Sequence, residues 1–243
     1  VVLLEELAGD DRQTCLNTFH EIKDQITGRS LKNIRQLSQL LLEAIPENPA
    51  VRCGLEMAML DALSRKLDIP LWSYLGGAGN NSLVTDVTIP ILSQERSMEL
   101  SGQWHEKGFR TLKIKVGSDY ESEVSLIASL AEKYPDLQFI IDANQGFEEE
   151  EALAFIRELL HRKCQVILYE QPVNRYDIDG MARLTSLLQI PVAADETVFS
   201  IKDLTRVIRH KAANVINLKI MKSGIFQTMQ IASTARRDRK SVV

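Results

Sequence analysis

Cysteine is scarce in this chain, and its three cysteines show none of the spacings that form disulfide frameworks or zinc sites. Cys15, Cys53 and Cys164 contain no CxxC pair and are odd in number, which predicts reduced thiols in a cytoplasmic protein. Long apolar runs are also missing. No stretch reaches the ~18 residues of a membrane span, and no basic-then-apolar signal peptide opens the sequence. We therefore expect no membrane partner.

An excess of positive charge is absent as well. The net charge is −4, and the one dense basic cluster, residues 236–240, is interpreted as a solvated segment. Nucleic acid and anionic membrane surfaces are therefore not expected as partners. Neither a GxGxxG motif nor a P-loop favours nucleotide binding. With 44% hydrophobic and 26% charged residues among 243, the composition is that of an ordinary globular protein.

The first third of the chain carries helical patterns. An apolar stripe at helical spacing predicts a helix over residues 31–43, and a second helix is predicted over 51–67, after Pro49. Pro70 and the Gly76-Gly77 pair mark the end of this region. The stripe consists of Leu31, Ile34, Leu37, Leu40 and Leu41.

From residue 82 onward, short β-branched runs alternate with longer amphipathic stretches. This alternation predicts an α/β fold with a parallel sheet, and a doubly wound sheet and a (β/α) barrel both fit it. The predicted strands are 84–91, 111–116, 139–144, 166–170, 192–195 and 215–219. The predicted helices are 93–107, 120–134, 148–162, 177–188, 200–211 and 224–235.

Ionisable residues lie at the carboxyl ends of five successive predicted strands. Their spacing is about one βα unit of a barrel, in which eight units occupy ~250 residues. In such barrels the active site lies at the carboxyl ends of the strands, where these side chains would converge. The residues are Lys113 and Lys115, Asp142, Glu170, Asp195 and Lys219.

Three converging carboxylates would repel one another unless a cation lies among them. Oxygen ligands favour Mg²⁺ over zinc, and no histidine falls at a predicted strand end. Lys113 and Lys115 are two residues apart, so on a strand they share a face. Adjacent ammonium groups and a cation are expected to lower a lysine pKa toward neutrality, which suits a general base.

Five motifs, in order, resemble the enolase superfamily and more narrowly its muconate lactonizing subgroup. Residues 54–62, followed by Pro70-Leu71 and Leu75-Gly76-Gly77, are similar to the linker helix and turn that lead from that family's capping domain into its barrel. The five motifs are Lys-Ile-Lys (113–115), Asp-Ala-Asn (142–144), Tyr-Glu-Gln-Pro (169–172), Ala-Asp-Glu (194–196) and Asn-Leu-Lys (217–219).

The resemblance implies an N-terminal α+β capping domain over a (β/α)₇β barrel, and a Lys base that works with Mg²⁺. Asp142, Glu170 and Asp195 would ligate the metal. Lys115 and Lys219 would serve opposite faces of the substrate α-carbon.

The resemblance also implies three substrate contacts. Lys113 would tune Lys115 and offset negative charge on the substrate, and Asn144 would contact the substrate. Thr88 matches a substrate-contacting threonine of the dipeptide epimerases, although an ordinary β-forming residue explains it equally well.

The resemblance favours an isomerase acting on a small carboxylate, most like a dipeptide epimerase of the L-Ala-D/L-Glu type. The wording of residues 194–200 and 219–224 is similar to those enzymes. Two alternatives of the same subgroup stay open: o-succinylbenzoate synthesis with N-acylamino acid racemisation, and cycloisomerisation. A homo-oligomer is possible.

The chain is shorter than a complete member of the family. We expect residues 1–80 to hold a partial capping domain with the linker helix, and residues 81–243 to hold barrel strands one to six without the last strands. A further alternative follows, of another class: a truncated remnant without catalytic activity. An open barrel fragment of this kind would expose sheet edges.

Overall fold

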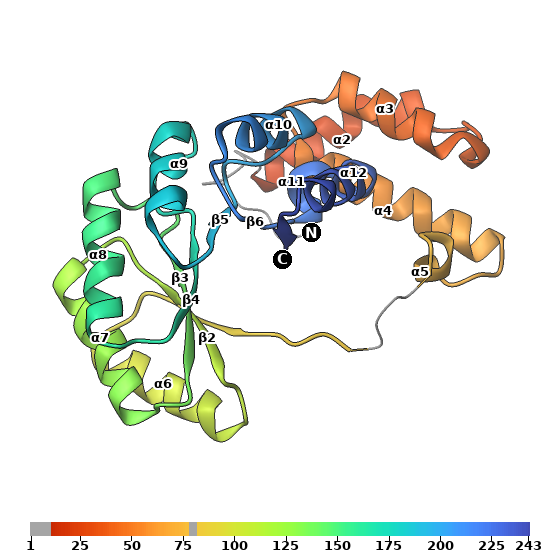
Figure 1. Cartoon of the computed structure of the whole chain (residues 1–243). Helices are drawn as coiled ribbons and strands as arrows, with labels where there is room; N and C mark the ends of the chain where they lie inside the picture. The colour runs from red at the N-terminus through yellow and green to blue at the C-terminus, as the bar shows by residue number, and fades with distance from the viewer. Residues whose placement is uncertain (1–10, 78–81) are drawn as a thin grey trace. The chain divides into compact units, whose positions relative to one another are not determined.

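A computed structural model of the chain describes residues 11–77 and 82–243 (Figure 1). These residues fall into two compact units. The first, here called the helical unit, comprises the described residues up to Leu83 with Phe199–Ile201 and Leu218–Thr234. The second, the sheet unit, comprises Val84–Val198, Lys202–Asn217 and Ala235–Val243. The boundary expected near residue 80 remains a prediction, and residues 1–10 and 78–81 lie outside the description.

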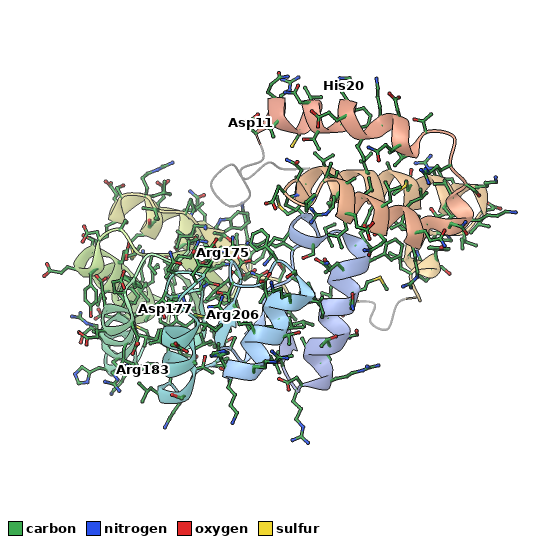
Figure 2. The ribbon with its side chains drawn as sticks, turned by 90° about the horizontal axis from the view of Figure 1, so that it is seen from above. Asp11, His20, Arg175, Asp177, Arg183 and Arg206 are labelled. Carbon is green, nitrogen blue, oxygen red and sulfur yellow. The ribbon has the colours of Figure 1, made fainter. Side chains whose placement is uncertain are left out.

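The helical unit is built from segments far apart in the sequence. Asp11, labelled in Figure 2, lies at the start of the first helix of this unit. Its side chain accepts a hydrogen bond from the Thr14 amide at 2.8 Å, the usual role of an N-cap aspartate. Its elements are α2 (Arg12–Ile26), η1 (Leu31–Asn33), α3 (Ile34–Ala44), α4 (Pro49–Lys66), α5 (Leu71–Tyr74), α11 (Ile220–Ser223) and most of α12 (Ile225–Arg237).

The core of the helical unit follows the predicted apolar stripe. Ile34, Leu37 and Leu41 of α3 are buried, together with Leu60 of α4. Ile225, the first residue of α12, belongs to the same core although it lies far along the chain. The helical unit therefore depends on residues from both ends of the described sequence.

The sheet unit holds a parallel sheet that has seven strands within the described residues, in the order β1 to β7. Helices follow the strands in alternation, as Figure 1 shows for β2, α7, β3 and α8. The strands are β1 (Val87–Ile89), β2 (Thr111–Lys115), β3 (Gln138–Asp142), β4 (Val166–Glu170), β5 (Val192–Ala194), β6 (Val215–Ile216) and β7 (Ser241–Val242). The helices are α6 (Gln94–Glu106), α7 (Tyr120–Lys133), α8 (Glu149–His161), α9 (Ile178–Leu187) and α10 (Ile201–His210).

The two faces of the sheet carry different residues because side chains alternate along each strand. Tyr169 of β4 is fully buried and donates from its hydroxyl to the carbonyl of Ala152 in α8, at 3.3 Å. Its neighbour Leu168 lies on the other face, in a cluster with Ala193 and Val215. By the same alternation, Glu170 shares the face of Leu168.

The predicted α/β fold is confirmed, and two details are corrected. The sheet has seven strands in the described residues rather than the six expected, because Ser241–Val242 pairs with β6. Strand β6 ends at Ile216, so Lys219 lies beyond the strand, at the N-cap of α11. Among residues 11–77 and 82–243, none of the helices has both the length and the apolar character that a membrane span requires.

Candidate active site

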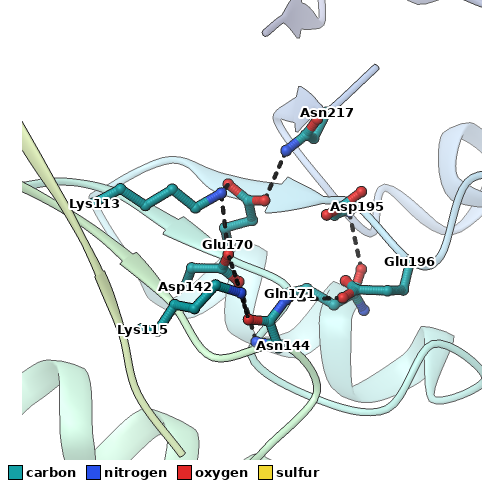
Figure 3. Close-up of polar contacts among 9 residues, drawn as sticks. All are labelled: Lys113, Lys115, Asp142, Asn144, Glu170, Gln171, Asp195, Glu196 and Asn217. Carbon is teal, nitrogen blue, oxygen red and sulfur yellow. Dashed lines mark hydrogen bonds and ion pairs between the residues drawn. The ribbon is translucent and has the colours of Figure 1, made fainter. Parts of the chain in front are cut away.

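The carboxyl ends of β2, β3 and β4 bring together residues that the sequence pattern selected (Figure 3). The register of the sheet pairs Lys115 with Asp142, and Asp142 with Glu170. Asp142 and Glu170 are each 2% exposed. Neighbouring positions in parallel strands share a face, so one lysine and two carboxylates lie side by side at this end of the sheet.

Lys113 lies between these two carboxylates. Its ammonium is 3.0 Å from Asp142 Oδ2 and 2.8 Å from Glu170 Oε2. Burial alone would lower the pKa of Lys113, but Asp142 and Glu170 together outweigh burial and raise that pKa above its ordinary value. Carboxylates rather than ammonium groups therefore dominate the surroundings of Lys113, and the lowered pKa expected for a lysine beside a bound cation remains a prediction.

Lys115 lies at the start of a polar chain that sequence analysis did not foresee. Its ammonium is 3.7 Å from Asp142 Oδ2 and donates a hydrogen bond to Asn144 Oδ1. The Asn144 amide nitrogen in turn donates to Glu196 Oε1 at 3.0 Å. Asn144 has a positive φ of 43°, a conformation that asparagine tolerates better than most residues. One side-chain amide therefore links a lysine to a buried carboxylate.

Negative charge exceeds positive charge within this cluster. Burial first, and then Asp142, raise the pKa of Glu170. Burial and Asp195 raise the pKa of Glu196, whose Oε2 is buried without a hydrogen-bond partner in the described residues. The donor atoms are carboxylate oxygens, the ligands that Mg²⁺ prefers. The residues therefore fit a hard divalent cation in charge and chemistry.

The arrangement differs from a preformed metal cluster. Within the described ranges, no three His, Cys, Asp or Glu side chains are placed to hold a metal ion. The ammonium of Lys113, rather than a shared cation, connects Asp142 and Glu170. The ligand roles expected for Asp142, Glu170 and Asp195 therefore remain predictions.

Two side-chain amides that were given no role from the sequence support this cluster, one through the backbone of Asp195 and one through the carboxylate of Glu170. Gln171, fully buried, accepts the backbone amide of Asp195 at 3.0 Å through Oε1. Asn217 donates from Nδ2 to Glu170 Oε1 at 2.7 Å. Both belong to motifs that carried the family resemblance, so the motif letters themselves were the signal that could have identified them.

Thr88 and Lys219, the remaining candidates, lie in different units. Thr88 is the register partner of Lys113 on β1, in the sheet unit. Lys219 belongs to the helical unit, where it precedes the short helix α11. Each unit thus holds one of the two lysines expected to act as acid and base.

A cavity of about 310 Å³ adjoins Lys115 in the sheet unit. The loop after β1, the loop after β2 and the first two turns of α7 contribute to its lining, with Ile91, Ser118 and Leu126 as examples. Glu123 fixes the loop that follows Lys115, because its carboxylate accepts the backbone amides of residues 117–119 at 2.9–3.1 Å. Lys115 therefore borders a cavity, and Glu123 holds in place residues 117–119, a loop that contributes to the cavity's lining.

Comparison with known proteins gives the family context. Residues 96–243 match the family described as enolase C-terminal domain-like, and residues 7–76 match the mandelate racemase / muconate lactonizing enzyme N-terminal domain. An L-Ala-D/L-amino acid epimerase of Populus trichocarpa is 34% identical over 240 residues, which are 96% of this chain and 57% of that protein.

Two solved structures are similar over nearly the whole chain. The substrate-liganded L-Ala-D/L-Glu epimerase of Bacillus subtilis has a TM-score of 0.94 and 28% identity, covering 98% of this chain and 67% of that one. The dipeptide epimerase of Enterococcus faecalis, complexed with Mg and the dipeptide L-Leu-L-Tyr, has a TM-score of 0.93 and 27% identity, covering 99% and 68%.

The chain spans 57% of the length of its poplar relative and about two thirds of the two solved structures. Its N-terminal and C-terminal matches occur in the order that the predicted linker helix and barrel require. The parallel sheet with alternating helices agrees with the barrel folds of these neighbours. The chain belongs to the enolase superfamily, with the domains of the mandelate racemase and muconate lactonizing enzymes.

Proposed function

We propose that this chain catalyses Mg²⁺-dependent epimerisation at the α-carbon of a small carboxylate substrate. The observation that supports this most directly is the placement of Lys115 beside Asp142 and Glu170 on one face of the sheet. A base within reach of a carboxylate-rich cation site is what removal of an α-proton from a carboxylate anion requires.

In this proposal Asp142, Glu170 and Asp195 would hold Mg²⁺. The bound cation would supply positive charge that attracts the substrate carboxylate and stabilises the charge that develops on it. Lys113, whose ammonium lies 3.0 Å from Asp142 and 2.8 Å from Glu170, would add a second positive charge at the same place.

Proton movement in this proposal needs two lysines in opposite protonation states. Neutral Lys115 would accept the α-proton on Nζ, while the electron pair of the broken C–H bond moves toward the carboxylate. Protonated Lys219 would then donate its proton to the other face of the same carbon. The reverse reaction exchanges these roles, which makes epimerisation the natural outcome of a two-lysine site.

The substrate in this proposal is a dipeptide, because the relatives with that activity in their names are similar over nearly all of this chain. The cavity beside Lys115 would accommodate substrate atoms beyond the reacting carbon. Asn144 and Thr88 would contact the substrate from β3 and β1.

Exchange of the α-proton with solvent tests the proposal without a product assay. Ala-Glu is incubated with the chain and Mg²⁺ in D₂O, and loss of the α-proton signal is followed by NMR. We expect exchange with the wild-type chain, and a loss of roughly 10²–10⁴-fold in Lys115→Ala, the usual contribution of a general base.

Lys202→Ala is the matched control, since Lys202 is an exposed lysine on α10, outside the cluster. It should exchange at the wild-type rate. Unchanged exchange in Lys115→Ala would exclude Lys115 as the base. Absence of exchange with Ala-Glu and a panel of other dipeptides, in the presence of Mg²⁺, would overturn the proposed function and support a remnant without activity.

A further inference from the structure

The position of Lys219 is set by a tight turn that follows it. Lys219 accepts the amide of Lys222 at 2.9 Å, and Gly224 donates to the carbonyl of Ile220 at 2.7 Å. Gly224 has a φ of 77°, and α12 begins at the next residue. The backbone therefore passes from Lys219 to the start of α12 in a single short helix, with little freedom between them.

A buried carboxylate from α4, a helix far away in the sequence, holds the end of this turn that leads into α12. Glu56 lies on α4 and is 4% exposed. Its Oε2 accepts the backbone amide of Ile225 at 2.6 Å, and its Oε1 accepts the hydroxyl of Ser38. A negative charge at the first amide of a helix is stabilising because it satisfies an unpaired donor and opposes the helix dipole.

Gly224 gives the carboxylate access to this amide. A Cβ atom at residue 224 would lie 2.6 Å from Glu56 Oε2 and 3.0 Å from its carboxyl carbon. The positive φ of Gly224 also disfavours other residues. The carboxylate therefore packs directly against the backbone of the turn, at a distance that side chains would prevent.

The turn is also fastened on its other side. Ser223 donates from its hydroxyl to the carbonyl of Phe199 at 2.7 Å, and the ammonium of Lys222 lies 5.5 Å from the centre of the Phe199 ring. Phe199 belongs to the helical unit, as do Glu56 and the turn itself. The turn is consequently held between two fixed points of one compact unit.

We propose that Glu56 is a positioning residue for Lys219. Its carboxylate fixes the start of α12, which fixes the turn, which sets the direction of the Lys219 side chain. The inference rests on the proposed function, in which Lys219 serves one face of the substrate α-carbon. It adds that a residue of α4, in the helical unit, controls the chemistry on that face and leaves the other face to Lys115.

The test separates the two faces by using the two epimers of Ala-Glu in turn. Each epimer presents its α-proton to one lysine, so Lys219→Ala identifies the epimer whose deuterium exchange depends on Lys219. We expect Glu56→Ala to slow exchange of that same epimer on the order of 100-fold, the cost of misplacing a reacting group by about 1 Å. Exchange of the other epimer should stay within about twofold of the wild-type rate.

Conservative variants distinguish positioning from a general loss of structure. Glu56→Gln can still accept the Ile225 amide through its oxygen and donate to Ser38, so it should restore exchange of the affected epimer. Asp61→Asn, on the same helix, removes a carboxylate that is exposed and paired with Arg65, and should change neither rate. If Glu56→Ala does not fold, Glu56→Asp, one methylene shorter, takes its place with the same expected split.

The outcomes are distinguishable. Equal slowing of both epimers in Glu56→Ala, or slowing of the epimer that depends on Lys115, would overturn the positioning role and leave the proposed function standing. Absence of exchange of either epimer in the wild-type chain would overturn the proposed function and this inference with it.

Discussion

Replacement of Lys113 by methionine should destabilise the chain far more than the same replacement of Lys115. Lys113 is 15% exposed and contacts two carboxylates that are each 2% exposed, at 3.0 and 2.8 Å. Removing one partner of a buried ion pair leaves an uncompensated charge and costs about 3–5 kcal/mol. Lys115 is 37% exposed and lies 3.7 Å from Asp142, so its pairing contributes about 0–1 kcal/mol.

Urea denaturation followed by circular dichroism, in buffer containing EDTA, measures both losses. A deficit of 3 kcal/mol corresponds to a fall in melting temperature of roughly 6–12 °C for a chain of this size. Methionine keeps the length of the lysine stem, so the comparison isolates the charge. Equal free energies of unfolding for Lys113→Met and Lys115→Met would refute the reasoning that Lys113 compensates Asp142 and Glu170.

Addition of Mg²⁺ extends the same experiment. If the carboxylates bind the cation, Mg²⁺ at 100 times its dissociation constant should return about 2.7 kcal/mol to Lys113→Met. Ca²⁺-free and Mg²⁺-free controls give the baseline. Failure of Mg²⁺ to stabilise either the variant or the wild-type chain would contradict a metal site at these residues.

Two further predictions concern the same cluster. In Mg²⁺-free buffer, Glu170 and Glu196 hold a proton more tightly in the folded chain than at the ordinary value of 4.5; they should therefore lower the free energy of unfolding as pH rises through their raised pKa values. Urea titrations at stepped pH should show a smaller fall for Glu196→Gln, and an identical profile would contradict the burial effect. Gly146→Ala would place a Cβ 2.8 Å from Gly117 Cα, and should cost about 1–3 kcal/mol. The substitution should also slow exchange at the face served by Lys115. An unfolding curve identical to that of the wild-type chain would show that the loops after β2 and β3, which contain Gly117 and Gly146, move apart without cost.

The sequence alone was sufficient to predict an element where its hydrophobic pattern agrees with its burial in the structure. Strand 166–170 was predicted with the bounds that the structure gives it, because a continuous apolar run predicts a strand buried on both faces. The cluster at the carboxyl ends of β2 to β4 was predicted because parallel strands bring their ends to one edge. Residues 84–91 were predicted as a strand, yet β1 spans Val87–Ile89 and Val84 is 98% exposed, since strand length depends on the neighbouring strand.

The remaining features depend on contacts that sequence spacing does not encode. The raised pKa of Lys113 comes from Asp142 and Glu170, which lie on other strands. Sequence spacing shows that Lys115 is two residues away, but it does not show that these two carboxylates lie within 3.0 Å of Lys113. Helix α2 lies in the part of the chain predicted to be helical, but no bounds were predicted for it because its apolar face is weak, with Leu16 43% and Phe19 39% exposed. The contact of Glu56 with the start of α12 could not be predicted either, because its partner is the backbone amide of Ile225 and a backbone partner leaves no pattern in the sequence.

The separation of Glu56 from Ile225 also has a consequence for synthesis of the protein. The two residues are 169 positions apart, and at 5–20 residues per second a ribosome needs roughly 10–30 s to make the intervening chain. During that interval α3 and α4 have emerged without the α12 residue that completes their core. Helices in that state expose apolar surface. The nascent chain should therefore pass through a period in which chaperones bind residues 34–63, and that binding should end once α12 has been translated.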